Sequence, residues 1–187
     1  MLRTYNNVDA GRISIYGSSN GSGMVNSLLI ELDGAAFQSA ACSVSQMISK
    51  MYHDGSFWHN AAGNNTYDQT IVPARGRRIL SISGTADSII PYTGGNSVVG
   101  SSFMPCQESI YRFAQVMGEI GPQLADSAGI PGNGTNGYSA PFVKYSYGNG
   151  QVVHYKLIGG DHGLRVSGNN AYASEANQLM ADFLLPQ

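Results

Sequence analysis

The stretch ISIYGSSNGSGMVNSLLIEL, residues 13–32, joins a short apolar run to a turn rich in glycine and serine and then to a second apolar segment. Residues 13–16 predict a short buried strand. After the turn, apolar residues recur at helical spacing up to Asp33-Gly34, which predicts a helix over residues 24–32. A strand, a tight turn and a helix in this order are typical of α/β folds.

The same alternation continues along the chain and predicts the overall architecture. A chain of 187 residues, 42% of them hydrophobic, is expected to form one domain, residues 1–187. Strands alternating with helices predict a mostly parallel sheet of about four strands, covered on both faces. The further strands are expected at 35–44, 78–83 and 152–158, the further helix faces at 106–120 and 172–183, and loops at 54–69 and 128–141.

Composition restricts the partners. The formal net charge is −2 and only 12% of residues are charged, which argues against nucleic acid as a partner. No segment approaches the roughly 18 apolar residues of a membrane span, and residues 1–7 lack the apolar core of a signal peptide. No cofactor is expected. Cys42 and Cys106 are expected either to form one bridge or to be two buried thiols, and both alternatives stay open.

Three predicted strands end in groups suited to acyl transfer: Ser19, Asp87 and His162. In a parallel sheet, the carboxyl ends of the strands meet at one edge, where ligands bind. Because G-x-S-x-G arises easily by chance in a chain with 24 glycines, the motif at Ser19 decides little by itself. The order Ser…Asp…His is, however, that of the α/β-hydrolase triad. The occurrence of all three residues at strand ends and in this order is therefore a stronger signal than the motif alone.

Each group has a predicted role and a simpler alternative. Ser19 is the predicted nucleophile, His162 its general base and Asp87 the carboxylate that orients the imidazole. The backbone N–H of Asn20 is the predicted oxyanion donor. Gly17, Gly21 and Gly23 are expected to give the turn and helix room. The alternatives are a plain Gly-Ser turn, a capping aspartate and a loop histidine.

The remaining candidates are weaker. Trp58 is a candidate for stacking on a sugar or phenolic ring, with equal weight on covering the edge of the core. His53 and His59 lack the spacing of metal ligands, so no metal site is expected. His154, inside a predicted strand, is expected to be structural, and Asp161 to be exposed to solvent.

Four segments resemble the polyhydroxybutyrate depolymerase and feruloyl esterase group of α/β-hydrolases. They are RISIYGSSNGSGM (12–24), SGTADSIIPYTGG (83–95), SSFMPCQESIYRFAQ (101–115) and VVHYKLIGGDHG (152–163). The resemblance implies a secreted serine esterase with Ser19, Asp87 and His162 as its triad. Polar sequons at 64–66 and 133–135, and a surface with few lysines and many Asn, Ser, Gly and Tyr residues, are also typical of secreted enzymes that meet carbohydrate.

The chain departs from that group in several places. Ser22 replaces the group's second glycine, Ser83 replaces its histidine, and Gly163-Leu164 follows His162 where an aromatic residue is common. Only residues 1–18 precede Ser19, whereas the group has several strands and a second oxyanion donor there. We therefore expect only the C-terminal portion of an α/β-hydrolase domain, either as a truncated chain or with its apolar sheet edge covered by a second chain or by self-association.

Two functions are compatible with the sequence. The first is a serine carboxylic-ester hydrolase that forms an acyl-enzyme, with feruloyl or acetyl esters of plant cell-wall polysaccharide as expected substrates and polyhydroxyalkanoate as an alternative. The second is an inactive or weakly active hydrolase remnant that serves as a binding module.

Overall fold

The computed structural model describes residues 5–185 and has the mixed α/β architecture that the sequence predicts. Its main sheet has six strands, four of them parallel and the last two antiparallel. In spatial order these are β1 (Ser14–Ser18), β2 (Ser39–Ser43), β6 (Arg78–Gly84), β11 (Val152–Leu157), β10 (Phe142–Tyr147) and β9 (Ile130–Pro131).

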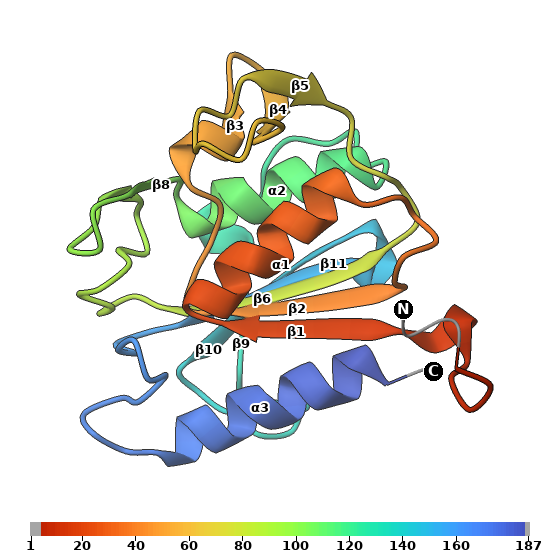
Figure 1. Cartoon of the computed structure of the whole chain (residues 1–187). Coiled ribbons are helices and arrows are strands. Elements are labelled where there is room, and N and C mark those ends of the chain that lie inside the picture. The colour runs from red at the N-terminus through yellow and green to blue at the C-terminus, as the bar shows by residue number, and fades with distance from the viewer. Residues whose placement is uncertain (1–4, 186–187) are drawn as a thin grey trace.

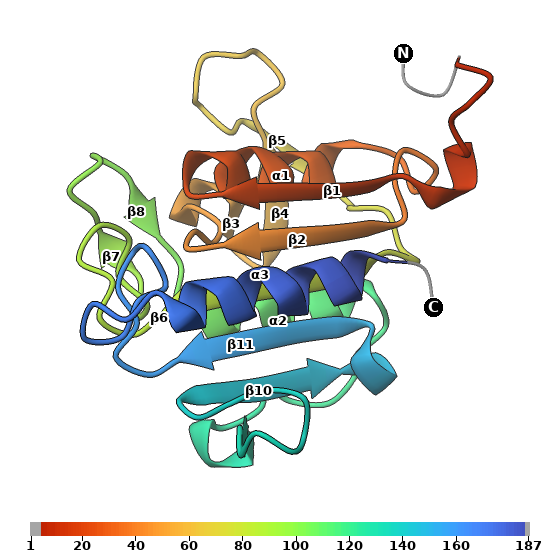
Figure 2. The ribbon, with the colours of Figure 1, turned by 90° about the horizontal axis from the view of Figure 1, so that it is seen from below.

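Three α-helices cover the sheet in the described part of the chain: α1 (Asn20–Glu31), α2 (Cys106–Val116) and α3 (Ala171–Leu184). Helices α1 and α2 lie on one face and α3 lies on the other (Figures 1 and 2). Each face has its own buried cluster, one that includes Leu29, Ile79 and Phe113 and one that includes Leu80, Phe142 and Met180. The sheet is therefore covered on both faces, as expected for parallel strands.

The prediction was wrong on two features of the sheet. It expected about four strands, whereas the main sheet has six, because it missed β10 and β9 beyond β11. Residues 54–69, expected to be a loop, contribute instead to a small antiparallel sheet of β3 (Tyr52–His53), β4 (Ser56–His59) and β5 (Gln69–Ile71). Strands of two to four residues are too short for a periodic signal.

The short elements complete the described chain. A two-stranded sheet is formed by β7 (Gly95–Asn96) and β8 (Ser102–Phe103). Short 3₁₀ turns occur at Ala10–Arg12, Ser49–Met51, Asp126–Ala128 and Gly148–Gly150.

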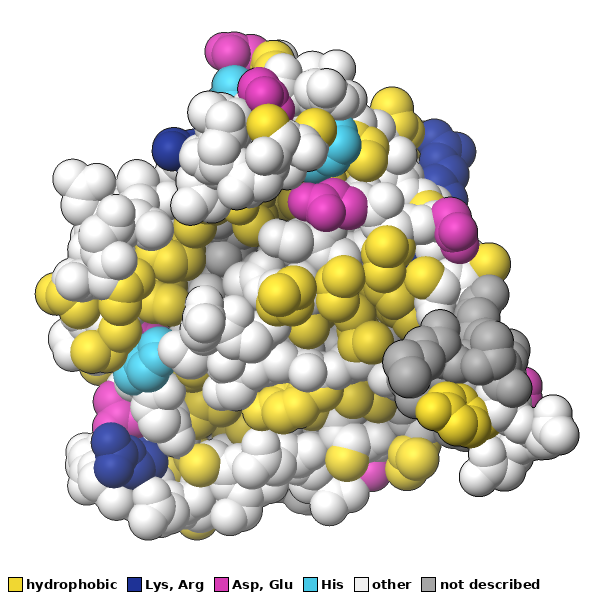
Figure 3. Space-filling view, viewed as in Figure 1, with side chains coloured by type: hydrophobic (Ala, Val, Ile, Leu, Met, Phe, Trp, Pro, Cys, Tyr) yellow, Lys and Arg dark blue, Asp and Glu magenta, His cyan; other side chains and the backbone are white. Residues whose placement is uncertain are grey.

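Strand β1 forms one edge of the main sheet, where β2 is its only partner among residues 5–185. Apolar side chains gather on the same side of the molecule, over α1 and β1 (Figure 3). Tyr16, Met24 and Leu32 are 51%, 62% and 39% exposed. An unpaired strand of this kind is a template for pairing with another chain. Self-association along this edge stays a prediction.

The C-terminal end of α1 is fixed by Arg77, which is 1% exposed. Its guanidinium donates hydrogen bonds to the carbonyl oxygens of Leu29 (3.0 Å), Leu32 (2.7 Å) and Asp33, and it lies over the ring of Phe37. Because the last carbonyls of a helix have no partner within it, these bonds satisfy them and anchor α1 against the sheet. Within the described residues, no helix is long and apolar enough to cross a membrane.

Candidate active site

Ser19 lies on a sharp turn between the last residue of β1 and the first residue of α1. Its backbone has φ 52° and ψ −118°, a conformation that residues other than glycine rarely adopt. Its N–H donates to the carbonyl of Ser43 on β2 at 2.9 Å, which holds the turn to the neighbouring strand. Strained backbone of this kind is concentrated at functional sites, where surrounding contacts maintain it.

Of the three glycines expected to give this turn room, only Gly17 does so. A Cβ atom on Gly17 would lie 2.2 Å from the carbonyl oxygen of Gly21, far inside van der Waals contact. A Cβ atom on Gly21 or Gly23 would meet nothing within 4 Å, so the expectation for these two was wrong. Of these three glycines, only Gly17 is needed for the close approach of β1 to the start of α1.

Ser22 fastens the turn to β2, a role that the sequence did not reveal. The side chain is fully buried, and its Oγ accepts the N–H of Ser43 at 2.9 Å. The same oxygen lies 2.6 Å from the carbonyl oxygen of Gly17 and 2.8 Å from that of Ser43. The residue that departs from the resembled motif thus connects the strand, the turn and the neighbouring strand.

The structure brings Ser19, His162 and Asp87 into one hydrogen-bonded row. Ser19 Oγ lies 2.8 Å from His162 Nε2, and His162 Nδ1 lies 2.7 Å from Asp87 Oδ2. The other carboxylate oxygen, Oδ1, accepts the backbone N–H groups of Ile89 (2.8 Å) and Ile90 (2.9 Å). An ionised carboxylate only accepts hydrogen bonds, so this network assigns the proton to Nδ1 and leaves the Nε2 lone pair facing the serine hydroxyl.

Burial differs across this row in a way that suits proton transfer. The Asp87 side chain is 1% exposed, whereas that of His162 is 26% exposed. The carboxylate is therefore almost entirely removed from solvent, while the imidazole remains within reach of a substrate. Electrostatic interaction between an imidazolium and this carboxylate is strengthened by the exclusion of water around Asp87.

The loops that carry Asp87 and His162 are tied directly to each other. Ala86 N–H donates to the carbonyl of Gly160 at 2.9 Å, and Gly159 N–H donates to Thr85 Oγ1 at 2.8 Å. A Cβ atom on Gly84 would lie 2.1 Å from the Gly160 carbonyl oxygen, so this approach requires glycine. The two loops consequently form one structural unit.

Asp161 orders the histidine loop and does not contact the imidazole in the hydrogen-bond network. Its Oδ1 accepts the N–H groups of Gly163 (2.8 Å) and Arg165 (2.9 Å), and its Oδ2 pairs with the Arg165 side chain at 2.9 Å. Its side chain is 38% exposed, in line with the expectation of solvent exposure.

His154 connects the sheet to the segment after Asp87. The side chain is fully buried, with Nδ1 2.6 Å from Ser81 Oγ on β6 and Nε2 2.9 Å from the hydroxyl of Tyr92. Burial lowers the pKa of His154 to about 3 and raises the pKa of Tyr92, so both groups are neutral at ordinary pH. His154 therefore has a structural role, as the sequence indicated.

The predicted oxyanion donor, the N–H of Asn20, stands at the first position of α1. The first N–H groups of a helix have no partner within the helix, and the helix dipole favours negative charge at this end. Among residues 5–185, the Asn20 N–H has no hydrogen-bond acceptor outside α1. It is available to an oxygen bound beside Ser19.

Two cavities flank the hydrogen-bonded row. One, of about 230 Å³, is lined by His162 together with Tyr16, Val44 and Leu164. The other, of about 600 Å³, is lined by Asp87 and Tyr92 among others.

Trp58 lines neither cavity. It lies on β4, stacked on the His53 ring at 4.6 Å, with Nε1 donating to the His53 carbonyl at 3.1 Å. The structure thus does not bring Trp58 to the row of three side chains.

Cys42 and Cys106 are free, buried thiols. Burial raises the pKa of each to about 12, which makes both chemically inert at neutral pH. Across residues 5–185, no three His, Cys, Asp or Glu side chains are grouped as metal ligands would be.

Comparison with known proteins adds no relative to this picture: no family model, no curated protein and no solved structure matches the chain.

Proposed function

We propose that the chain is a serine carboxylic-ester hydrolase that acts through an acyl-enzyme. The observation that carries the proposal is the continuous path from Asp87 through His162 to Ser19, with distances of 2.7 and 2.8 Å. A serine hydroxyl becomes a competent nucleophile when a neighbouring base removes its proton during attack. The orienting carboxylate, the base and the strained nucleophile here stand in that relation.

The proposed reaction has two halves. Ser19 Oγ attacks the ester carbonyl carbon while its proton passes to His162 Nε2, and Asp87 stabilises the resulting imidazolium. The Asn20 N–H donates to the developing oxyanion, a contact worth roughly 3 kcal/mol in such sites. The C–O bond then breaks, the leaving alkoxide takes the proton from Nε2, and a water activated by His162 later hydrolyses the acyl-serine.

The finer assignment rests on the sequence resemblance. We propose that the six-stranded sheet is a partial α/β-hydrolase sheet, because the serine follows a strand that leads into a helix and the Asp and His follow later strands. Feruloyl or acetyl esters of plant cell-wall polysaccharide are the proposed substrates, with the 230 Å³ cavity beside His162 as the proposed substrate pocket. Secretion is part of the same proposal.

The test is covalent labelling with a fluorophosphonate probe, with the modified residue located by mass spectrometry. Labelling at Ser19 that is lost in Ser19→Ala supports the proposal. Ser102→Ala is the matched control, because Ser102 is an exposed hydroxyl on β8 that lines neither cavity beside the row and should leave labelling unchanged. Folded protein without Ser19-dependent labelling would support the remnant or binding module instead.

Turnover then separates the substrate classes. Burst hydrolysis of p-nitrophenyl acetate measures acylation, and comparison of methyl ferulate, acetylated xylan and a hydroxybutyrate trimer ranks the esters. Preference for the trimer would overturn the cell-wall assignment in favour of polyhydroxyalkanoate, while leaving the serine mechanism in place.

A further inference from the structure

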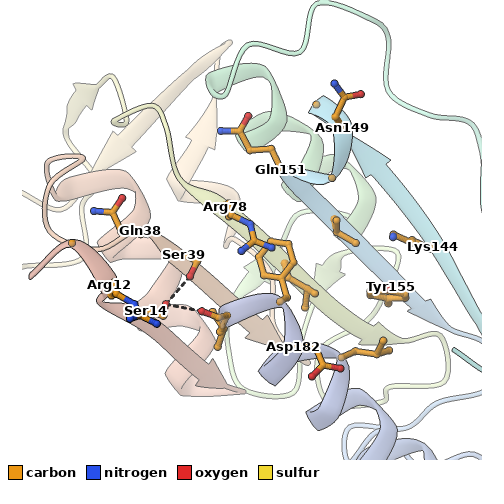
Figure 4. A pocket seen from close by; sticks show the side chains of 18 residues that line it. Arg12, Ser14, Gln38, Ser39, Arg78, Lys144, Asn149, Gln151, Tyr155 and Asp182 are labelled. Atoms are coloured by element: carbon orange, nitrogen blue, oxygen red, sulfur yellow. Dashed lines mark hydrogen bonds between the residues drawn. The ribbon is translucent and has the colours of Figure 1, made fainter. Parts of the chain in front are cut away.

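A cavity of about 840 Å³ lies on the α3 side of the sheet, at the ends where its parallel strands begin. It is lined by Ser14 on β1, Ser39 on β2 and Arg78 on β6 (Figure 4). Ser19 follows the opposite end of β1, five residues from Ser14 and roughly 16 Å away at the usual rise of a strand. The cavity is thus separate from the candidate active site.

The lining is cationic in a chain that is acidic overall. Among residues 5–185, Arg12, Arg78 and Lys144 line the cavity against a single carboxylate, Asp182, although the whole chain has 10 Lys and Arg residues and 12 Asp and Glu residues. The ion pairs within residues 5–185 involve other cations, and Asp182 accepts a hydrogen bond from Gln178 instead. Three cations that form no ion pair in the described chain, against one carboxylate, favour an anionic ligand.

Aromatic rings hold two of these cations in place. The Arg78 guanidinium carbon lies 4.4 Å from the centroid of the Phe183 ring, and Lys144 Nζ lies 5.9 Å from that of Tyr155. Stacking uses the face of a guanidinium and leaves the N–H groups on its edge free to bind a carboxylate in two contacts. Figure 4 shows Arg78 in the middle of the lining, with Arg12 and Lys144 on opposite sides.

The rest of the lining suits a ligand with hydroxyl groups. The side chains of Gln38, Asn149 and Gln151 line the cavity (Figure 4), and the Gln151 amide also donates to the Arg77 carbonyl at 3.2 Å. Amides donate and accept hydrogen bonds, as sugar hydroxyls require. The volume is within the range of small-molecule sites.

We propose that this cavity binds an acidic saccharide, with one uronate carboxylate on Arg78, another on Lys144 and the sugar hydroxyls on the amides of the lining. The proposal is independent of ester hydrolysis, since it uses no residue of the Ser19 site. A chain that also cleaves cell-wall esters would hold its polysaccharide through this second site.

The test is titration of the full chain, as Ser19→Ala so that no turnover occurs, with digalacturonic acid by isothermal calorimetry. The neutral disaccharide cellobiose and inorganic phosphate are the comparison probes. We expect saturable binding of digalacturonic acid that weakens as salt is raised, and none of cellobiose. Phosphate binding with equal or greater affinity would overturn the saccharide assignment, and absence of digalacturonic acid binding would overturn the site.

Two variants locate the binding. Arg78→Gln and Lys144→Gln should each weaken it about tenfold or more, because each removes a charge-assisted hydrogen bond. Lys144→Gln leaves the Arg78–Phe183 packing intact, so it keeps the test valid if Arg78→Gln lowers stability. Lys50→Gln is the matched control, because Lys50 is exposed and donates to the Asn65 carbonyl away from the cavity. Equal loss in Lys50→Gln would contradict the assignment.

Discussion

Gly84 and Gly160 approach each other so closely that a Cβ atom on Gly84 would lie 2.1 Å from the carbonyl oxygen of Gly160. Gly84 ends β6, three residues before Asp87, and Gly160 stands two residues before His162. The contact sets the distance between the two loops, and therefore the geometry of the Asp87–His162 hydrogen bond.

Gly84→Ala should separate these loops. We expect a loss of about 1–3 kcal/mol in the free energy of unfolding, the usual cost of forcing a methyl group into a packed site. We also expect at least a tenfold lower rate of fluorophosphonate labelling at Ser19. Urea unfolding and a labelling time course measure the two effects. Unchanged labelling in a folded variant would show that the contact does not position the site.

Gly17→Ala and Gly23→Ala form a matched pair at the serine turn. The first places a Cβ atom 2.2 Å from the Gly21 carbonyl oxygen and should destabilise the fold and reduce labelling. The second places one in open space inside α1, where alanine should add roughly 0.5–1 kcal/mol of stability. Thermal unfolding should show a lower melting temperature for Gly17→Ala and a higher one for Gly23→Ala. Equal shifts in melting temperature would contradict the steric argument.

Asp87→Asn should lower kcat about 10³–10⁴-fold while the fold is retained. The Ile89 and Ile90 N–H groups would hold the amide oxygen at the Oδ1 position and turn its NH₂ toward His162 Nδ1. The imidazole proton would then move to Nε2, which could no longer accept from Ser19. Asp54→Asn is the control, because Asp54 also pairs with a histidine, His53, but on the small sheet. A similar loss of kcat in both variants would refute the argument.

His154 should make stability depend on pH. Its pKa is about 3 in the fold, against about 6.5 in an unfolded chain, so between these values the unfolded state binds the additional proton. The stability that neutral His154 contributes is present above pH 6.5 and is lost as the pH falls, by up to about 1.4 kcal/mol per pH unit. His154→Gln should show a shallower decline of the unfolding free energy between pH 6 and pH 4 than the parent chain. Parallel curves for the two chains would contradict the prediction.

Cys42 and Cys106 should not react with Ellman's reagent in the native protein. Both thiols are buried, and a pKa of about 12 leaves roughly one thiolate in 10⁴ at pH 8. Two thiols should react after urea is added. A count of zero in urea would indicate a disulfide, and rapid reaction of either thiol without urea would show that it is accessible.

The strand–turn–helix around Ser19 and the four parallel strands could be predicted because each has a strong local pattern. Segment 142–147 was not predicted as a strand, although it pairs with all of β11. It directly follows the glycine-rich residues 128–141, whose composition indicates a loop. The groups that support the site could not be predicted for a different reason. Ser22, Gly160 and Tyr92 act through contacts with residues far away in the chain, and no spacing within their own segments indicates a partner.

Ser19 directly follows β1, an edge strand of the main sheet, and this position sets the order of events that we expect on heating. An outer strand held on one side frays before the strands inside it, and sub-global opening begins at such margins. Fraying of β1 would move the Ser19 hydroxyl away from the imidazole while β2, β6 and β11 remained assembled. Thermal inactivation would then precede melting of the sheet.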